Sequence, residues 1–401
     1  MPDLTPYTPQ SVFAHDDGDH HCVPQVLIAP SRYVQGSGTL EHLGRYLSLV
    51  PSRRAAVLLS AGGRHRDGAR LSKSLGSAGV GAEMVTFGGE CSLEEVERVA
   101  ALLRTRTPAV DCLVAVGGGK CVDAGKAIAW RLAIPAVICP SLASNDAPCS
   151  AVSVMYTPEG AWAGIEFFRE SPALVVVDTR VVAEAPVRYL VAGMGDAMAT
   201  WYEARTCLQN PEGRTVLGAR PTLAANALGE LCANTLFEHG IAAVTAVQRR
   251  EVTDALERVV EANTLLSGIG FESGGVAGAH AVAQGLTVIP AVARDYLHGE
   301  MVAMGLLTQL VFESRDAEAR RVAEFFAAVG LPIHLGQLSL GADDGRQLRS
   351  VMETALTLPF VGNEPLPVTV DGLLTASRRA DGLGRQVAQA TGEAAYRALH
   401  G

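Results

Sequence analysis

An aspartate and two histidines, all beyond residue 190, have side chains of the types that bind divalent metals. Asp196 lies in the run GMGDA, His280 in GGVAGAHAVAQG and His298 in DYLHGE. Their separations lack the short spacing typical of a metal site, so ordinary core or surface residues are the alternative. His280 is surrounded by glycine and other small residues, and His298 is followed by Gly299, which leaves room for a ligand. Two imidazoles and one carboxylate would give a three-ligand site with an open position, the arrangement of a catalytic divalent metal.

A glycine-rich turn at residues 117–120, GGGK, is the strongest local motif. It follows the apolar run CLVAV and precedes a helix that we expect to begin near Cys121. Glycine lets the backbone approach a pyrophosphate closely, and the N–H groups and dipole of a helix start favour negative charge. The run is neither GxGxxG nor a P-loop, so a plain tight turn is the alternative to a nucleotide site.

A second cluster, PSLASNDAP at residues 140–148, follows the apolar run AVICP. Small hydroxyl side chains and an acid at the carboxyl end of a parallel strand lie where such sheets bind ligands. An Asx-type turn before Pro148 explains the same residues without a ligand, and the sequence does not separate these two interpretations.

Short apolar runs closed by Gly, Pro or Asp alternate with helically periodic segments up to about residue 185. The runs are typical of buried parallel strands and lie at residues 55–60, 112–118, 136–140 and 173–178. Apolar residues at helical spacing occupy residues 93–107 and 121–133 between them. Later segments are long and helically periodic, at residues 220–240, 249–268, 298–314 and 317–330.

These patterns predict an α/β protein with two domains. Residues 23–185 are expected to form a Rossmann-like open parallel sheet that binds a dinucleotide, and residues 186–401 an all-helical metal-binding domain. The boundary between them is a favoured place for a small-ligand site. Residues 1–22 are rich in Pro, His and Asp and are expected to be a flexible extension, although the His, Asp and Cys side chains of residues 15–22 could also bind a metal.

The overall charge and composition exclude several classes of function. The 401 residues include 33 Lys and Arg against 42 Asp and Glu, a net charge of −9, and no basic run is interleaved with aromatics. Nucleic-acid binding is therefore not expected. No long apolar stretch or signal peptide is visible, so we expect a cytoplasmic protein without membrane contact. Eight dispersed cysteines without a CxxC pair are expected to be reduced.

Several longer runs resemble one enzyme family. They are YVQGSGTL, FGGECSLEEVERV, VGGGKCVDAGKAIA, ASNDAPCSAVSVMYTPEG, APVRYLVAGMGDAMATWYEA, EANTLLSGIGFESGG, HGEMVAMGLLTQLV and PLPVT. Together they resemble the glycerol dehydrogenases of the iron-containing (group III) alcohol dehydrogenase superfamily, over about residues 24–395. The resemblance implies a dehydroquinate synthase-like architecture and a homo-oligomer, an octamer in this family.

The resemblance also implies roles for particular residues. Asp196, His280 and His298 match the metal ligands, with zinc usual in glycerol dehydrogenases and iron in relatives. Asp146 matches the carboxylate that binds the polyol, so these four residues are the expected catalytic set. The positions that match the binding site for NAD, with NADP as the alternative, are Ser60, Gly118, Gly119, Lys120, Asp123, Ser141, Ser144, Ser150, Val152 and Tyr156.

Three features depart from the family pattern. Ser60 stands where the family usually has an Asp that holds the adenosine ribose, and Arg64 or Arg66 could pair with a ribose phosphate instead. Asn145 stands where a Thr is common before the substrate-binding Asp. The segment LTVIPAVARDYL lacks the histidine-rich character usual between the two histidine ligands and is one residue longer. The first change concerns NAD or NADP, and the other two concern the substrate.

The sequence therefore predicts a metal-dependent, NAD(P)-linked dehydrogenase that interconverts a small polyol, such as glycerol or another vicinal diol, and its ketone or aldehyde. Oxidation by hydride transfer leaves negative charge on the alcohol oxygen, and a divalent metal with an open position stabilises such charge. The same chemistry on another alcohol, a hydroxy acid or a biosynthetic aldehyde is the main alternative. A lyase of the dehydroquinate synthase type and a non-catalytic metal- or nucleotide-binding scaffold are weaker ones.

Overall fold

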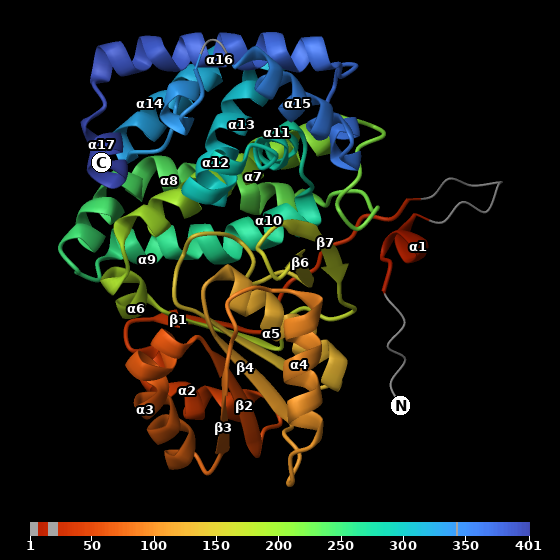
Figure 1. Cartoon of the computed structure of the whole chain (residues 1–401), viewed down its shortest axis with the longest axis vertical. Coiled ribbons are helices and arrows are strands. Elements are labelled where there is room, and N and C mark those ends of the chain that lie inside the picture. Colours follow the sequence, from red (N-terminus) through yellow and green to blue (C-terminus); the bar gives the residue numbers. More distant parts are fainter. Residues whose placement is uncertain (1–6, 15–22, 342–343) are drawn as a thin grey trace.

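Six parallel strands form the sheet of the N-terminal half (Figure 1), in a computed structural model that describes residues 7–14, 23–341 and 344–401. Their order across the sheet is β1-β8-β5-β4-β2-β3, and all neighbouring pairs are parallel. The strands are β1 (Tyr33–Gly36), β2 (Arg54–Leu59), β3 (Gly81–Thr86), β4 (Cys112–Gly117), β5 (Ala136–Pro140) and β8 (Leu174–Asp178). The α/β fold predicted from the sequence is confirmed.

Helices cover both faces of this sheet because its strands bury both faces. In β2, Val57 and Leu59 pack with the side chains of α2 and α3, whereas Ala56 and Leu58 pack with those of α4 and α5. This alternation follows from the two-residue period of a strand. The helices are α2 (Leu43–Tyr46), α3 (Ala61–Ser77), α4 (Leu93–Arg104) and α5 (Gly119–Leu132).

The strand order reverses between β2 and β4. The chain passes outward from β2 to β3, returns to place β4 on the other side of β2, and continues to β5 and β8. Open α/β sheets bind ligands at the carboxyl ends of the strands that flank such a reversal. Ser60, at the end of β2, and the GGGK turn, at the end of β4, occupy those two positions.

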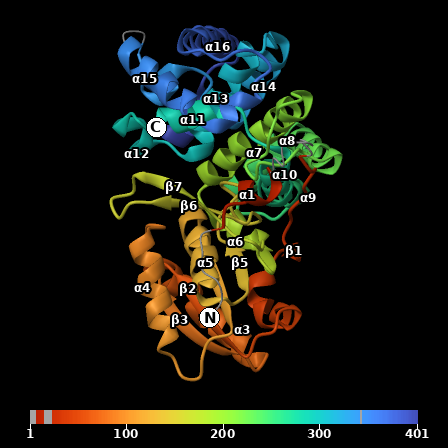
Figure 2. The same ribbon diagram turned by 90° about the vertical axis from the view of Figure 1, so that its right-hand side faces the viewer.

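An antiparallel hairpin, β6 (Val152–Tyr156) and β7 (Trp162–Phe167), lies between the sheet and the helices (Figure 2). The sequence patterns did not predict this hairpin, nor strands β1 and β3. The hairpin also contacts part of the N-terminal extension: Tyr7 forms an antiparallel bridge with Phe167, and the short helix α1 (Gln10–Phe13) follows. The metal-binding alternative at residues 15–22 lies outside the described residues.

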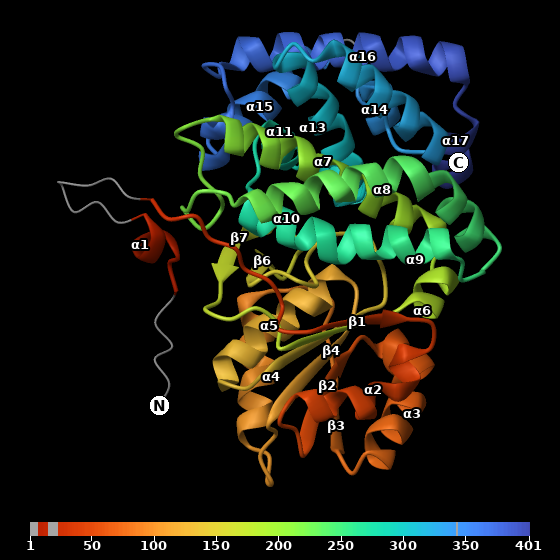
Figure 3. The same ribbon diagram turned by 180° about the vertical axis from the view of Figure 1, so that it is seen from behind.

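The C-terminal half is helical and is arranged around α13 (His298–Phe312), whose residues 299–311 are all buried. α7 (Val187–Gln209) and α11 (Gly278–Leu286) pack against α13. α8 and α9 run side by side on the face nearest the viewer in Figure 3. The other helices are α6 (Thr179–Glu184), α8 (Leu223–Gln248), α9 (Asp254–Glu261), α10 (Ser267–Gly274), α12 (Pro290–Asp295), α14 (Asp316–Val329), α15 (Gly345–Leu356), α16 (Val370–Thr391) and α17 (Ala394–His400). The short turns η4 (Leu335–Leu338) and η5 (Pro359–Asn363) also belong to this half. Two others, η1 (Thr39–His42) and η2 (Leu47–Leu49), lie between β1 and β2.

The segment expected as one helix at residues 249–268 is built differently. Thr253 caps α9, because its hydroxyl accepts the N–H of Leu256, and a π-helical turn η3 (Ala262–Leu266) separates α9 from α10. Within η3, the Asn263 amide donates to Ala143 O at 2.9 Å and to Leu190 O at 3.1 Å. The π turn thus places one amide between the loop after β5 and the first turns of α7.

All seven cysteines of the described residues are free and buried. They are spread over the sheet and the helices: Cys91, Cys112, Cys121, Cys139, Cys149, Cys207 and Cys232. No helix in the described ranges is long and apolar enough to cross a membrane.

Candidate active site

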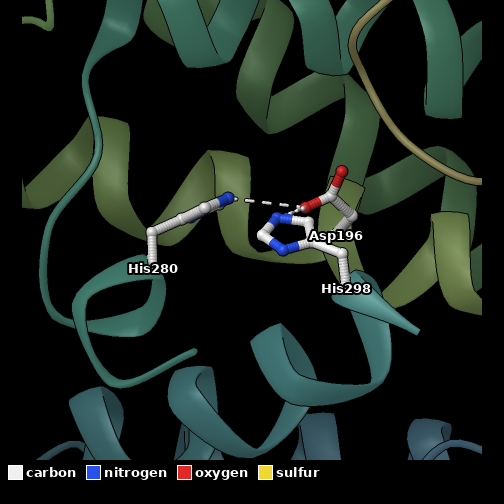
Figure 4. Close-up of side chains that lie close together, drawn as sticks. All are labelled: Asp196, His280 and His298. Carbon is white, nitrogen blue, oxygen red and sulfur yellow. Dashed lines mark ion pairs between the residues drawn. The ribbon is translucent and has the colours of Figure 1, made fainter. Parts of the chain in front are cut away.

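Asp196, His280 and His298 meet where three helices come together (Figure 4). Asp196 lies on α7, His280 on α11, and His298 is the first residue of α13. The Nε2 atoms of His280 and His298 lie 3.4 and 3.3 Å from Oδ1 of Asp196. One candidate ligand atom from each residue lies within 4.8 Å of the other two. The fold thus gathers three residues that are widely separated in sequence.

The chemistry of this cluster suits a divalent cation. Neither carboxylate oxygen of Asp196 accepts a hydrogen bond, although both are buried. A buried carboxylate that accepts no hydrogen bond is costly, and a bound cation would compensate that cost. Burial alone would raise the pKa of Asp196, but His298 and His280 together hold it below its usual range, so the carboxylate is ionised. The side chain of His298 is 47% exposed, which leaves one side of the cluster open to a ligand.

Two glycines next to the candidate ligands bring α7 and α13 into backbone contact. A Cβ atom on Gly299 would lie 1.8 Å from Ala192 O, and one on Gly195 would lie 2.3 Å from Gly299 O. Side chains at these positions would force the helices apart. Because Gly195 precedes Asp196 and Gly299 follows His298, this crossing sets the distance between the two ligands.

Glu203 orients His280 and was missed by the sequence analysis. Its Oε2 lies 2.5 Å from His280 Nδ1, and its Oε1 accepts the backbone N–H groups of Ala277 and His280 at 2.7 and 2.9 Å. A proton held on Nδ1 leaves Nε2 free to bind a metal. The signal was present in the sequence, since Glu203 follows Asp196 by two helical turns and therefore shares its face of α7.

We expect Glu203→Gln to weaken metal binding about 10- to 100-fold, because the variant loses the negative charge that fixes the His280 tautomer. Competition with a coloured chelator measures the affinity. Glu313→Gln is the matched control, because Glu313 is equally buried but accepts hydrogen bonds from Thr206 and Gln309 instead. Equal metal affinity in the two variants would contradict the role of Glu203.

The glycine-rich turn and the loop after β5 lie against each other. Gly118 caps α5, and a Cβ atom on Gly119 would lie 2.5 Å from Nδ2 of Asn145. The backbone N–H of Ser141 donates to Gly117 O at 2.9 Å. The exposed N–H groups at the start of α5 and the polar residues of this loop, including Ser144, therefore share one edge of the sheet. A side chain at residue 119 would require Asn145 to move, and glycine at this turn also lets the backbone approach a diphosphate closely.

Lys120 pairs with one acidic side chain and lies over one aromatic ring. Its Nζ lies 2.6 Å from Oε2 of Glu90 and 4.7 Å from the centre of the Tyr156 ring. Its side chain is 42% exposed, so it remains accessible to a ligand. The sequence analysis did not single out Glu90, although it lies in the family-like run FGGECSLEEVERV.

Asp123 lies deeper in α5, where its carboxylate pairs with Lys126 at 2.9 Å and accepts the N–H of Val154 at 3.1 Å. Lys126 in turn donates to the carbonyl oxygens of Ser150 and Val152. This buried pair fixes the segment that the resemblance places beside the nicotinamide. The sequence alone gave Lys126 no role, because an isolated lysine on a helix is usually a surface charge.

Glu272, on α10, holds the same segment from the helical side. Its two carboxylate oxygens lie 3.0 and 3.2 Å from the backbone nitrogen of Ala151. Burial raises the pKa of Glu272 to about 7. The start of β6 is therefore fixed by one buried ionisable side chain from each half of the chain, Lys126 and Glu272.

Asp146 and Ser60 complete the expected set. Asp146 lies in the loop after β5, where burial and, next, the negative charge of Asp196 raise the pKa of its carboxyl group well above the usual value. Ser60 caps α3 by accepting the N–H of Gly63 at 3.0 Å. Arg64 and Arg66 are exposed in the first turns of α3, and Arg66 pairs with Asp67 at 2.8 Å.

Comparison with known proteins gives the family. The family model described as iron-containing alcohol dehydrogenase matches residues 30–179. A glycerol dehydrogenase of Escherichia coli O6:H1 is 44% identical over 370 residues, which are 91% of this chain and 99% of that protein. The chain belongs to the iron-containing alcohol dehydrogenase family. The resemblance predicted from its motifs is confirmed, and the protein is an alcohol dehydrogenase of this family.

Other members of the family are similar over nearly the whole chain. A glycerol dehydrogenase of Thermotoga maritima is 43% identical over 89% of this chain and 97% of its own length. A glycolaldehyde reductase of Halobacterium salinarum is 39% identical over 90% of this chain and 98% of its own. The crystal structure of a probable glycerol dehydrogenase from Sinorhizobium meliloti 1021 covers 90% of this chain and 99% of its own, with 37% identity and a TM-score of 0.83.

Proposed function

We propose that this enzyme interconverts a small polyol, with glycerol as the leading candidate, and the corresponding ketone or aldehyde, using NAD and one divalent metal. The observation that carries the proposal is the cluster of Asp196, His280 and His298, which offers three metal-binding side chains and is open on the side of His298. The loop that carries Asp146 packs on α7 one turn before Asp196, since a Cβ atom on Gly193 would lie 2.0 Å from Ala143 O. A vicinal diol has two hydroxyl groups, and this arrangement offers one partner for each. Glycerol dehydrogenases and a glycolaldehyde reductase among the relatives act on molecules of this size, as their names state.

Residues of the helical half would bind the metal, and residues of the sheet half would bind the cofactor. Asp196, His280 and His298 would hold the metal, zinc or iron, which would act as a Lewis acid and stabilise negative charge on the substrate oxygen. NAD, when bound, accepts the hydride. Gly118, Gly119 and Lys120 offer N–H groups and a positive charge to the cofactor diphosphate.

Other residues position the reactants. Lys126 and Glu272 hold the start of β6, where Ser150 and Val152 would face the nicotinamide, and Tyr156 ends the same strand. Asp146 would orient the second hydroxyl of the substrate. Correct placement of the two reacting carbons is itself a large part of catalysis.

A substrate screen tests the proposal directly. Glycerol, 1,2-propanediol, 1-propanol and 2-hydroxy acids are each offered with NAD and with NADP, and initial rates are measured. We expect the diols to exceed 1-propanol in kcat/KM. Activity confined to hydroxy acids would show that Asn145 and the segment before His298 have changed the pocket, and would overturn the polyol assignment. We also infer a cytoplasmic homo-oligomer, an octamer by resemblance, which size-exclusion chromatography with light scattering checks.

Cofactor choice is tested at Ser60. Aspartate also caps helices well, so Ser60→Asp should keep α3 intact while adding a carboxylate at the end of β2. We expect the ratio of kcat/KM for NAD over that for NADP to rise about tenfold or more, because a carboxylate repels a ribose phosphate and each 1.36 kcal/mol changes a rate tenfold. Ser60→Asn is the uncharged control. An equal ratio in the two variants would show that this position does not read the ribose.

A further inference from the structure

The last helix of the chain reaches the start of the helix that carries His298. His400, at the end of α17, places Nε2 at 2.8 Å from Oε1 of Glu300, in the first turn of α13. His400 is 8% exposed and Glu300 only 1%. The imidazole of His400 is itself fixed, since it stacks on Tyr396 with ring centres 4.1 Å apart and an interplanar angle of 14°. Tyr396 in turn donates its hydroxyl hydrogen to Gln337 O.

Glu300 also links α13 to α7. Arg188, in the first turn of α7, donates from Nε and Nη2 to the two carboxylate oxygens of Glu300 at 2.6 and 2.7 Å. The backbone N–H of Leu297 donates to Oε2 at 2.8 Å and closes the first turn of α13. One buried carboxylate thus joins the two helices that carry Asp196 and His298 to the C-terminal helix.

The two histidines of the metal cluster are held in different ways. His280 is fixed through its side chain by Glu203. His298 makes no hydrogen bond to a second residue within the described ranges, and its only polar contact there is with Asp196. The direction of its imidazole therefore depends on the backbone of the first turn of α13, which begins at His298 and which Glu300 closes.

We propose that Arg188, Glu300 and His400 form a clamp that positions His298 as a metal ligand from outside the metal site. The proposal rests on the metal site proposed above. It makes His400 a positioning residue that acts through Glu300, and it gives the C-terminal helix a role in metal retention. Residues that do not touch the metal can affect its binding in this way, because a ligand held in the correct orientation by its neighbours binds the metal more tightly.

The test compares three histidine variants of the metal-loaded enzyme first, and then Arg188→Met and His280→Ala. His400→Ala removes the contact with Glu300, and His400→Gln keeps a donor that reaches the same oxygen. His334→Ala is the matched control, since His334 is 10% exposed and pairs with Glu393 at 2.9 Å, beside the same C-terminal helix but away from Glu300. Metal loss to excess chelator is followed in time, and the visible spectrum of the cobalt(II)-substituted enzyme reports the geometry around the metal.

We expect His400→Ala to lose metal about tenfold faster than the wild type and to change the cobalt spectrum, whereas His400→Gln and His334→Ala keep both properties. Arg188→Met, which keeps the apolar part of the side chain, should act in the same direction as His400→Ala and serves if that variant folds poorly. Thermal unfolding of each variant separates a general loss of stability from a change at the metal.

Two outcomes distinguish the clamp from the metal site itself. If His280→Ala binds metal as the wild type does, the proposed metal site is wrong. If His280→Ala loses the metal but His400→Ala and Arg188→Met release it at the wild-type rate with an unchanged cobalt spectrum, the site stands and the clamp is wrong. A similar loss of thermal stability in His400→Ala and His334→Ala without faster metal release would also overturn the clamp.

Discussion

His280→Ala is expected to abolish metal binding at the cluster and to lower kcat/KM by about 1,000-fold or more. Lewis-acid stabilisation by a bound metal is worth several kcal/mol, and about 4 kcal/mol corresponds to that change in rate. The variant would also leave Glu203 buried without its imidazole partner and Asp196 with one ligand neighbour fewer. Metal analysis of the purified protein and initial rates on glycerol provide the two measurements.

His239→Ala is the control for this prediction. His239 lies on α8, away from the cluster in sequence, and its Nε2 lies 3.6 Å from a carboxylate oxygen of its neighbour Glu238. We expect that variant to keep its metal and its activity. Full metal occupancy together with unchanged turnover in His280→Ala would show that this histidine is not a ligand.

Asp146→Ala is expected to reduce kcat/KM for glycerol by about 100- to 1,000-fold and to leave the low activity on 1-propanol nearly unchanged. A site built to pair a substrate hydroxyl can discriminate against an analogue without it by up to about 10⁴–10⁵, and the variant removes that pairing. The measurement is the ratio of kcat/KM for the two alcohols. A monoalcohol has no second hydroxyl for Asp146 to accept, so it reports the rest of the site.

Asp146→Asn refines the result. Asparagine keeps an oxygen that accepts a hydrogen bond but carries no charge, so it should retain part of the preference for glycerol. If Asp146→Ala lowers kcat/KM equally for glycerol and for 1-propanol, Asp146 does not bind the second hydroxyl of the substrate. The basis for the expected preference for polyols would then be removed.

The sequence predicted the elements whose signals are local. Strands β2, β4, β5 and β8 are continuous apolar runs because both of their faces are buried, and such runs are visible without a structure. β3 lies at the edge of the sheet, has a mostly exposed or half-buried pattern and was missed. The hairpin was missed for the same reason, since β7 has no fully buried residue.

The residues of the candidate site likewise fall into those that local sequence signals reveal and those that only the fold brings together. The glycine turn and the loop after β5 were visible because their residue types are unusual at the ends of strands. Spacing in the sequence did not bring the three candidate ligands together, because the distance between Asp196 and His298 depends on the crossing of α7 and α13. Only their sequence neighbours and the family resemblance drew attention to them. The contact between Glu300 and His400 joins residues that are 100 positions apart in the sequence, and no sequence pattern marks it.

The reactivity of the buried cysteines reports the unfolding of this enzyme. Burial raises the pKa of the thiols well above the usual value, to about 12 for Cys112 and for Cys207. Thiol reagents attack the thiolate, so the folded enzyme should resist alkylation wherever these residues stay enclosed. Cys112 lies in the central sheet and Cys207 on α7, so mass spectrometry of alkylated peptides would time the unfolding of the two halves separately. No label would need to be introduced, because each half of the chain already carries buried thiols that react only when it unfolds.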